Sequence, residues 1–260
     1  MPTPPLDIFG DPQQERILLY GMTGSRKSSA WLQVALWHQR MQSDARFHVI
    51  HTDNSLSKLM GGSRFGSLRN VVKYDVDNMQ EYLDAGSKIH DAVRPHDFFV
   101  VDLIDDAWMA AQDEYSDIVE GENLDKLWLT QRAAGSDRYP IEGWNWGVIK
   151  KRYGRLATRR IEKANCHVIA CARTGQVREA SGGNSGDDQA IKDWFQSTGG
   201  VKPGGEKNDP YRFHTIIFLT VKRDVAKMQI MKDRERELGK FEYTDFFRDY
   251  MVGRAGWTLT

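Results

Sequence analysis

The sequence has little of what marks secreted, membrane-spanning or zinc-binding proteins. Its only cysteines among 260 residues are Cys166 and Cys171, which flank an apolar run. Two thiols without a partner cluster fit neither a zinc site nor a disulfide framework, so we expect reduced thiols on a buried strand. The mean hydropathy is −0.58, and no apolar run approaches the ~20 residues that cross a bilayer, which excludes a membrane span.

An excess of charge of one sign is also missing, because 36 Lys and Arg residues balance 36 Asp and Glu residues. This balance argues against a strong global positive field for nucleic acid, although a local basic groove stays open. Residues 1–11 have neither the basic stretch nor the apolar core of a signal peptide, so we expect a cytoplasmic protein. Hydrophobic residues make up 40% and aromatic residues 11%, which excludes wholesale disorder.

Short apolar runs alternate with amphipathic stretches along the chain. Continuous apolar runs indicate strands covered on both faces, as in a mostly parallel α/β sheet with helices on both sides. We expect such strands at residues 17–20, 47–51, 71–74, 98–101 and 166–172, and helices at residues 28–41, 78–93 and 146–164. Residues 214–221 and 227–231 predict a C-terminal antiparallel strand pair, and residues 243–251 a short helix.

Residues 177–209 interrupt this alternation, because they are rich in Gly, Ser, Asp and Lys. A loop of this length inside a compact domain is usually functional or disordered. We therefore expect an N-terminal arm at residues 1–15, one domain at 16–242 with a mobile loop at 177–209, and a C-terminal helix and tail at 243–260.

The sharpest motif lies between the first expected strand and the first expected helix. The P-loop pattern G-x-x-x-x-G-K-[ST] matches at Gly21, Lys27 and Ser28. Small residues let backbone N–H groups wrap phosphates, and the helix N-terminus adds a favourable dipole. Lys27 would reach the β- and γ-phosphates of ATP, and Ser28 would hold Mg²⁺. The expected nucleotide-binding residues are Gly21, Met22, Thr23, Gly24, Ser25, Arg26, Lys27, Ser28 and Ser29.

Arg26 departs from the motif, which has glycine at this position. If the loop needs a backbone angle that only glycine adopts easily, arginine costs roughly 1 kcal/mol or more. Alternatively, the loop accepts arginine at a negative φ, or the site has lost turnover.

Acidic residues follow two of the expected strands. Asp102 ends the run 98–102 and has the place of a Walker B carboxylate, which orients the Mg²⁺ shell. Asp53 follows the strand 47–51 and is a candidate for orienting the attacking water, or else a turn residue. For Asp105 and Asp106 we favour capping of the next helix.

Together these motifs resemble those of the RecA-like ATPases. Lys232 and Arg234, at the end of the last expected strand, resemble the Lys-x-Arg element of that family. The resemblance implies that both act in trans on a neighbour's γ-phosphate, in a ring or filament of identical chains; a solvated charge run is the alternative. The chain looks most like small phage-encoded ATPases associated with single-strand annealing recombination. It departs from the family at Arg26 and at Asp53, where a Glu is usual.

The resemblance also implies a γ-phosphate sensor after the fourth strand, where Gln176 stands, and a DNA-binding loop behind it. The segment 177–209 could order on single-stranded DNA through its Lys and aromatic residues, or could be a disordered surface loop. The helix 146–164 is basic and is a solvated face, a contact with acidic residues of a neighbouring subunit, or a DNA contact. Its cations are Lys150, Lys151, Arg152, Arg155, Arg159, Arg160 and Lys163.

The resulting hypothesis is an ATP- and Mg²⁺-dependent P-loop ATPase that acts on single-stranded DNA in phage-type recombination or replication. Lys27, Asp53, Asp102, Gln176, Lys232 and Arg234 are its expected catalytic residues, and Ser28 and Asp102 its metal ligands. Two alternatives remain open: a nucleotide-gated DNA-binding or assembly protein without turnover, and a P-loop kinase of a small metabolite.

Overall fold

A single eight-stranded sheet organises the computed structural model, which describes residues 2–4, 13–52, 55–136, 141, 145–179, 186–234 and 238–259. In spatial order its strands are β11 (Gly239–Tyr243), β10 (Val225–Lys232), β9 (Thr215–Lys222), β2 (Arg16–Tyr20), β6 (His167–Ala172), β5 (Phe98–Asp102), β3 (Phe47–His51) and β4 (Val71–Asp75). The pairs from β9 to β4 are parallel, whereas β9–β10 and β10–β11 are antiparallel. The expected fold class, a mostly parallel sheet with a C-terminal antiparallel pair, is confirmed.

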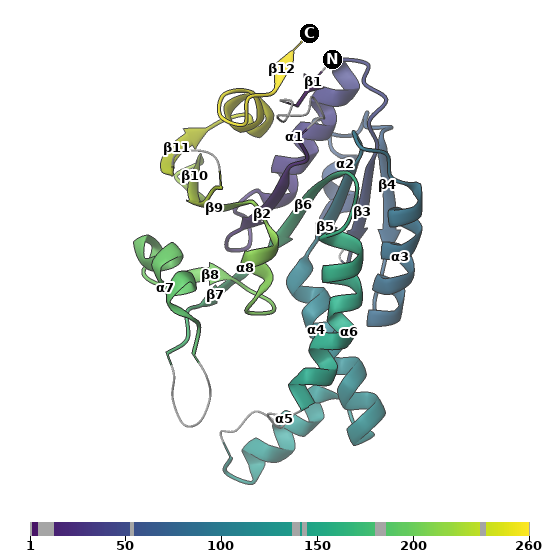
Figure 1. Cartoon of the computed structure of the whole chain (residues 1–260), viewed down its shortest axis with the longest axis vertical. Coiled ribbons are helices and arrows are strands. Elements are labelled where there is room, and N and C mark those ends of the chain that lie inside the picture. The colour runs from purple at the N-terminus through teal and green to yellow at the C-terminus, as the bar shows by residue number, and fades with distance from the viewer. Residues whose placement is uncertain are drawn as a thin grey trace.

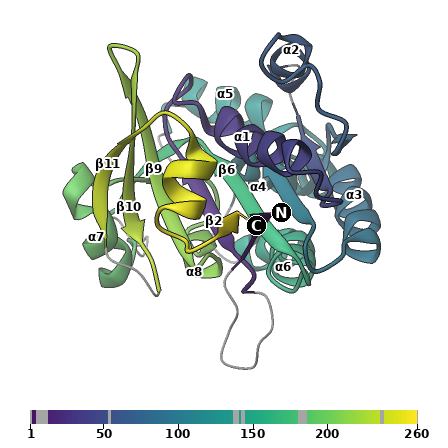
Figure 2. The same cartoon turned by 90° about the horizontal axis from the view of Figure 1, so that it is seen from above.

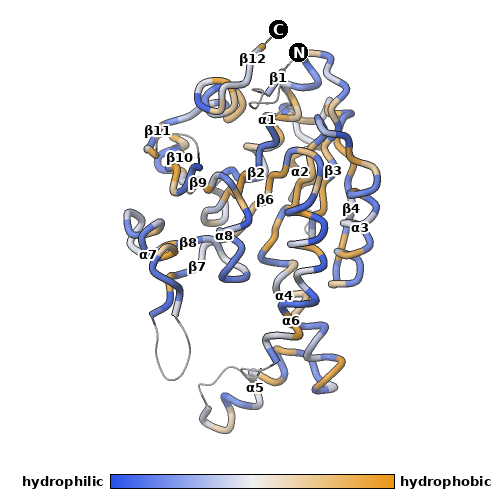
Figure 3. The backbone as a smooth tube through the Cα atoms, viewed as in Figure 1, coloured by the Kyte–Doolittle hydropathy of each residue, from blue (hydrophilic) through white to orange (hydrophobic). Residues whose placement is uncertain are grey.

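Helices cover both faces of the sheet (Figures 1 and 2). Helix α1 (Lys27–Arg40) and the π-helix η5 (Phe247–Val252) pack on one face, which we call the α1 face. Helices α3 (Met79–Ala92), α4 (Ile104–Tyr115) and α6 (Trp146–Leu156) pack on the other, the α6 face. Strand residues alternate between the two cores: Ile17 and Leu19 face α1, whereas Leu18 and Tyr20 face α6. This burial on both sides explains why the strands are continuously apolar (Figure 3).

Local sequence features account for the ends of several helices. The side chain of Asn78 accepts a hydrogen bond from the N–H of Glu81 and caps α3. Helix α6 passes into the π-helix η3 (Ala157–Ile161), so the long basic helix is present with a changed pitch in its second half. Cys166 and Cys171 are free and buried beside and within β6, as expected. Within the described part of the chain, none of the helices has the length and apolarity needed to cross a membrane.

Smaller elements complete the fold. They are β1 (Pro2–Thr3), α2 (Ser55–Gly61), η1 (Ser116–Glu120), α5 (Leu124–Ala133), β7 (Thr174–Gln176), α7 (Gln189–Phe195), η4 (Gln196–Thr198), β8 (Val201–Pro203), α8 (Asp209–Arg212) and β12 (Thr258–Leu259). Strand β1 pairs with β12, which joins the N-terminal arm to the C-terminal tail. The ends of α4 and α6, with η1 and α5, project beyond the sheet at the bottom of Figure 1.

Two expectations about the C-terminal half are wrong in part. The segment 243–251 is not one helix, because Tyr243 ends β11 and the helix begins at Phe247. Residues 239–243 alternate in burial and pair with β10, so a strand period was overlooked there. The segment 177–209 is not an irregular loop throughout, since α7, β8 and the start of α8 lie in it. Ile191 and Phe195, four residues apart, are buried and hold α7 against the core.

Candidate functional site

The P-loop segment connects β2 to α1, where the sequence places it. Gly21 follows the end of β2 and has no room for a side chain, because a Cβ atom there would lie 2.3 Å from the carbonyl oxygen of Leu219 on β9. The N–H of Gly21 donates to the carbonyl of Ala172 at the end of β6. The loop is therefore anchored to both neighbouring strands at the carboxyl edge of the sheet.

Lys27 is the first residue of α1 and is turned back into the loop. Its Nζ donates to the carbonyl oxygens of Gly21 at 2.8 Å and Met22 at 3.2 Å, and the side chain is buried. Ser28 and Ser29 follow in the first turn of α1 and are half-buried. The ammonium group thus lies inside the curve of the loop, next to the N-terminus of a helix, which is the place where an anionic ligand is favoured.

Arg26 has the left-handed backbone conformation that its motif reserves for glycine, with φ 68° and ψ 27°. The alternative of a negative φ is therefore wrong, because the chain must turn into α1 at this residue. A left-handed non-glycine residue costs roughly 1–2 kcal/mol. The guanidinium of Arg26 donates to the carbonyl of Asp224 at 3.3 Å, so the P-loop also contacts the β9–β10 turn.

Asp102 ends β5 and lies on the same edge of the sheet as the P-loop. Strand β6 separates β5 from β2, and in register Cys171 stands between Leu19 and Asp102. The carboxylate is buried and accepts a hydrogen bond from the indole N–H of Trp31 on α1 at 3.1 Å. Burial, together with this carboxylate, raises the pKa of the Cys171 thiol well above its usual value. Trp31 thus connects the P-loop helix with the expected metal-binding carboxylate.

An ion-pair cluster that the sequence analysis missed lies next to Asp102. Arg173, the residue after β6, donates through Nε to Asp105 at 2.8 Å and pairs with Asp106 through a terminal nitrogen. The hydroxyl of Thr52, after β3, donates to Asp106 at 2.8 Å. Asp105 and Asp106 stand in the first turn of α4, but they bind Arg173 rather than capping α4 alone. The sequence signal for this cluster was that Arg173 and Thr52 directly follow expected strands and that Asp105 and Asp106 come a few residues after a third.

Two further residues were expected at this edge of the sheet, Gln176 and Asp53. Gln176 lies on β7, is exposed, and pairs through its backbone register with Val201 of β8. It comes after β6, the strand expected to precede it, and its sensing role stays a prediction. Asp53 lies outside the described residues.

Lys232 and Arg234 differ in their surroundings. The Nζ of Lys232 donates to the carbonyls of Pro210 and Phe213, each at 2.7 Å, and lies 4.6 Å from the ring centre of Trp194. Burial, with Arg234 adding to it, lowers the pKa of Lys232 to about 8. Arg234 is exposed. Because β10 runs antiparallel to β9, both residues lie toward the start of β2, away from the P-loop of their own chain.

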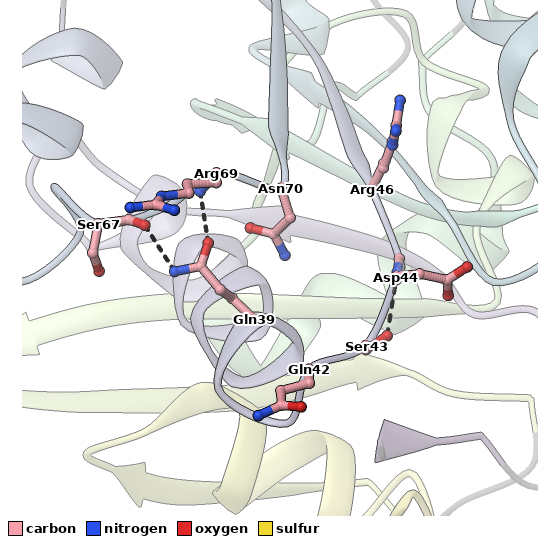
Figure 4. Close-up of a pocket in the computed structure, with 9 residues that line it drawn as sticks. Gln39, Gln42, Ser43, Asp44, Arg46, Ser67, Arg69 and Asn70 are labelled. Atoms are coloured by element: carbon pink, nitrogen blue, oxygen red, sulfur yellow. Dashed lines mark hydrogen bonds between the residues drawn. The ribbon is translucent and has the colours of Figure 1, made fainter.

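Two hollows lie at opposite ends of α1. One of about 810 Å³ borders the P-loop and is lined by Arg26, Met228, Phe241, Tyr243 and Arg254 among others. The other, of about 520 Å³, lies near the C-terminal end of α1, where Gln39 bonds to the backbone of Ser67 and Arg69 (Figure 4). Only the first adjoins the predicted site.

The donor set at the carboxyl edge suits Mg²⁺. The described residues contain no group of three or more His, Cys, Asp or Glu arranged around a metal position. Mg²⁺ often binds through one or two protein oxygens together with substrate phosphates and water. The Ser28 hydroxyl and the Asp102 carboxylate could provide those oxygens.

No protein-family model and no curated protein matches the chain. Among solved structures, the chain is similar to the KaiC-like protein PH0186 from the hyperthermophilic archaeon Pyrococcus horikoshii OT3, with 13% identity and a TM-score of 0.48. The match covers 91% of this chain and 88% of that one. A likeness of this strength does not bear on activity.

Proposed function

We propose that this chain binds ATP with Mg²⁺ at the loop 21–29 and hydrolyses it as a RecA-like ATPase that acts on single-stranded DNA. One observation carries the proposal: the ammonium group of Lys27 lies inside the P-loop, and the P-loop helix holds the carboxylate of Asp102 through Trp31. A cation and a carboxylate at one sheet edge are the groups that phosphate and Mg²⁺ require.

Each residue then has a role that its contacts support. Backbone N–H groups of the loop would receive the phosphate oxygens, and Lys27 would exchange its two carbonyl acceptors for the β- and γ-phosphates. Ser28 and Asp102 would hold Mg²⁺, whose charge stabilises the transferring phosphate. We assign the orientation of water to Asp53 and the sensing of the γ-phosphate to Gln176. The 810 Å³ hollow beside Arg26 has room for the nucleoside.

Hydrolysis would need a second copy of the chain. Arg234 is exposed and faces away from its own P-loop, so it is available only to a neighbour's γ-phosphate. Lys232 is held by carbonyl groups of its own chain, and we therefore propose that it positions the strand end rather than reaching across. An assembly of identical chains, as a ring or filament, follows from this assignment.

A nucleotide-gated protein without turnover is the second candidate, and the left-handed conformation of Arg26 favours it. Strain at such a residue persists only where surrounding contacts hold it. The bond from Arg26 to Asp224 ties the loop to the β9–β10 turn and could keep it in a binding form.

The first experiment measures ATP·Mg²⁺ binding and phosphate release, with and without single-stranded DNA, for the wild type and Lys27→Ala. Because a charge-assisted hydrogen bond contributes about 1.5–3 kcal/mol, we expect the variant to bind at least about tenfold more weakly. Its phosphate release should fall to background. Lys58→Ala, which removes an exposed lysine on α2, is the control.

Unchanged binding and release in Lys27→Ala would remove the P-loop assignment. Release from the wild type that increases with DNA would support the ATPase. Tight binding without release, under all conditions, would support the gated protein instead.

A further inference from the structure

A line of exposed cations follows one side of α6, η3 and the turn after η3. Lys151, Arg155, Arg159 and Lys163 stand four residues apart and are all exposed. We call these four residues the basic stripe. Lys151 and Arg155 lie on α6, where a spacing of four residues corresponds to about 6 Å along the helix axis, whereas Arg159 lies on η3 and Lys163 follows it. The stripe is the densest run of exposed positive charge on this segment.

The opposite side of the same helix packs against the core. Ile149, Tyr153 and Leu156 are buried against α3 and α4. At Gly86 of α3 a Cβ atom would meet the Leu156 side chain at 2.7 Å, which shows how closely the two helices approach. The stripe is therefore held in a fixed orientation by a rigid, packed element.

The cations of the stripe are distinguished from the other cations of α6 by their lack of partners. Arg152 forms an ion pair with Glu114, and Lys150 with the buried Glu206. In contrast, none of the four stripe residues forms a hydrogen bond or ion pair with another described residue. Their charges are therefore available to an external anion.

Acidic residues of the neighbouring helix α3 form no ion pair with the stripe. Glu81 accepts the N–H of Asp77, and Asp84 accepts the side-chain amide of Gln80. The exposed residues of α3 also include Lys88 beside Asp91.

In the segment 177–209, the other expected DNA-binding site, several Lys and aromatic side chains already contact residues of the same chain. Lys202 bonds to Asp187 at 2.8 Å, and both side chains are buried. Lys192 pairs with Glu179, and Trp194 lies against Lys232 and Tyr211. Of the two segments expected to contact DNA, the one that contains the stripe therefore offers more free positive charge among the described residues.

We propose that the basic stripe binds the phosphate backbone of a nucleic acid without reading its sequence; the choice of single-stranded DNA as its ligand rests on the proposed function. One strand of B-DNA carries a phosphate every ~3.4 Å along the helix axis, which is less than the ~6 Å between Lys151 and Arg155 on α6. Each cation of the stripe can therefore meet a phosphate of its own. A membrane surface fits less well, because Ile149, Tyr153 and Leu156 are buried and only Val148 remains on α6 as an exposed large apolar side chain.

The test is fluorescence anisotropy with a labelled single-stranded oligothymidylate across a series of salt concentrations, without nucleotide. For single strands the slope of log K against log salt changes by about 0.7 for each phosphate contact. Arg155→Ala/Arg159→Ala should therefore reduce the slope by about 1.4 and weaken binding at low salt. Arg155→Lys/Arg159→Lys keeps both charges and should retain most of the affinity.

The matched control is Arg40→Ala/Lys58→Ala, which removes two exposed cations from α1 and α2 on the opposite face of the sheet. It should bind as the wild type does. If Arg155→Ala/Arg159→Ala and Arg40→Ala/Lys58→Ala weaken DNA binding equally, the proposal that the stripe binds DNA is overturned. An unchanged salt slope in Arg155→Ala/Arg159→Ala would also overturn it. Wild-type binding to vesicles of phosphatidylserine and phosphatidylcholine, without binding to the oligonucleotide, would overturn it in favour of a membrane.

ATP·Mg²⁺ binding, measured separately on the same variants, distinguishes this proposal from the previous one. The stripe variants should bind ATP as the wild type does, because the stripe lies on the α6 face and the P-loop helix on the other. If the wild type binds DNA through the stripe but does not bind ATP, the stripe proposal stands and the proposed ATPase is excluded. If the wild type binds ATP but no DNA, the nucleotide site stands and the stripe proposal is excluded.

Discussion

At the scale of single residues, Asp102 depends on a donor from another element. A buried carboxylate is costly unless it is hydrogen-bonded, and Trp31 supplies an indole N–H from α1. Trp37, two turns further along the same helix, makes the same type of bond to the carboxylate of Asp245. The two tryptophans are thus a chemically matched pair, only one of which is at the candidate site.

We predict that Trp31→Phe weakens Mg²⁺-dependent nucleotide binding and that Trp37→Phe does not. Loss of a hydrogen bond to a buried charged group costs about 1.5–3 kcal/mol of stability, so Trp31→Phe should also be the less stable of the two. Urea unfolding and titration of ATP with and without Mg²⁺ measure these effects. Equal nucleotide binding by the two variants would show that Trp31 does not position Asp102 for the metal.

Arg26, also at the scale of single residues, occupies the position where the P-loop motif has glycine. Its left-handed φ of 68° is the angle for which glycine is normally chosen, and its side chain gains a contact with Asp224. The residue that breaks the sequence pattern therefore adopts the backbone that the pattern requires.

At the scale of elements, the P-loop depends on the close approach of β2 to β9. The residue after β2 is Gly21, and the carbonyl of Leu219 occupies the space that a side chain would need. Because that obstacle is backbone, it can move only if the strand moves.

We predict that Gly21→Ala is destabilised by more than about 2 kcal/mol, since overpacking of a tight core costs about 1–3 kcal/mol and here the clash is with backbone. Gly147→Ala, in α6, is the control, because its Cβ would meet nothing within 4 Å. It should be neutral or stabilised by up to about 1 kcal/mol, because alanine is the better helix former. Urea unfolding measures the stability of both variants. A Gly21→Ala unfolding midpoint equal to that of the wild type would contradict the close approach of β2 to β9.

At the scale of the whole molecule, the α1 core encloses two histidines. His38 lies among the rings of Phe47, Phe98, Phe247 and Trp257, and its Nδ1 bonds to the hydroxyl of Ser43. Burial, with His96 adding to it, lowers the pKa of His38 to about 3, and burial likewise lowers that of His167 to about 3. Both rings are therefore neutral in the folded protein at ordinary pH.

This burial predicts sensitivity to acid. Below about pH 6.5 the unfolded chain binds protons at these histidines and the folded chain does not, so the free energy of unfolding falls with pH. Asp209, whose pKa burial raises to about 7, acts in the opposite direction. A histidine variant therefore isolates the effect.

We predict that His38→Gln is less stable than the wild type at pH 7.5, and that the difference shrinks by about 2 kcal/mol on going to pH 5. Glutamine keeps a polar group near Ser43 but takes up no proton. Urea unfolding at several pH values measures the difference. A gap independent of pH would mean that His38 is protonated in the folded state.

The sequence by itself determined the strands of the main sheet other than β11, the P-loop and the approximate place of Asp102. These features depend on neighbouring residues: continuous apolar runs, the spacing of Gly21, Lys27 and Ser28, and an acid at a strand end. The mostly parallel sheet followed from the same runs, because only strands covered on both faces remain apolar throughout.

Only the tertiary structure decided which charged groups remain free. Lys232 and Lys202 stood in charged or flexible-looking stretches, yet both are buried by contacts from residues 15 or more positions away. Arg173 pairs with Asp105 and Asp106, more than 60 residues earlier, because parallel strands bring their carboxyl ends to one edge. Such pairings carry no local pattern, since they depend on strand order and not on spacing. Whether the four cations of the basic stripe stay unpaired likewise depends on which acidic side chains the fold brings near them.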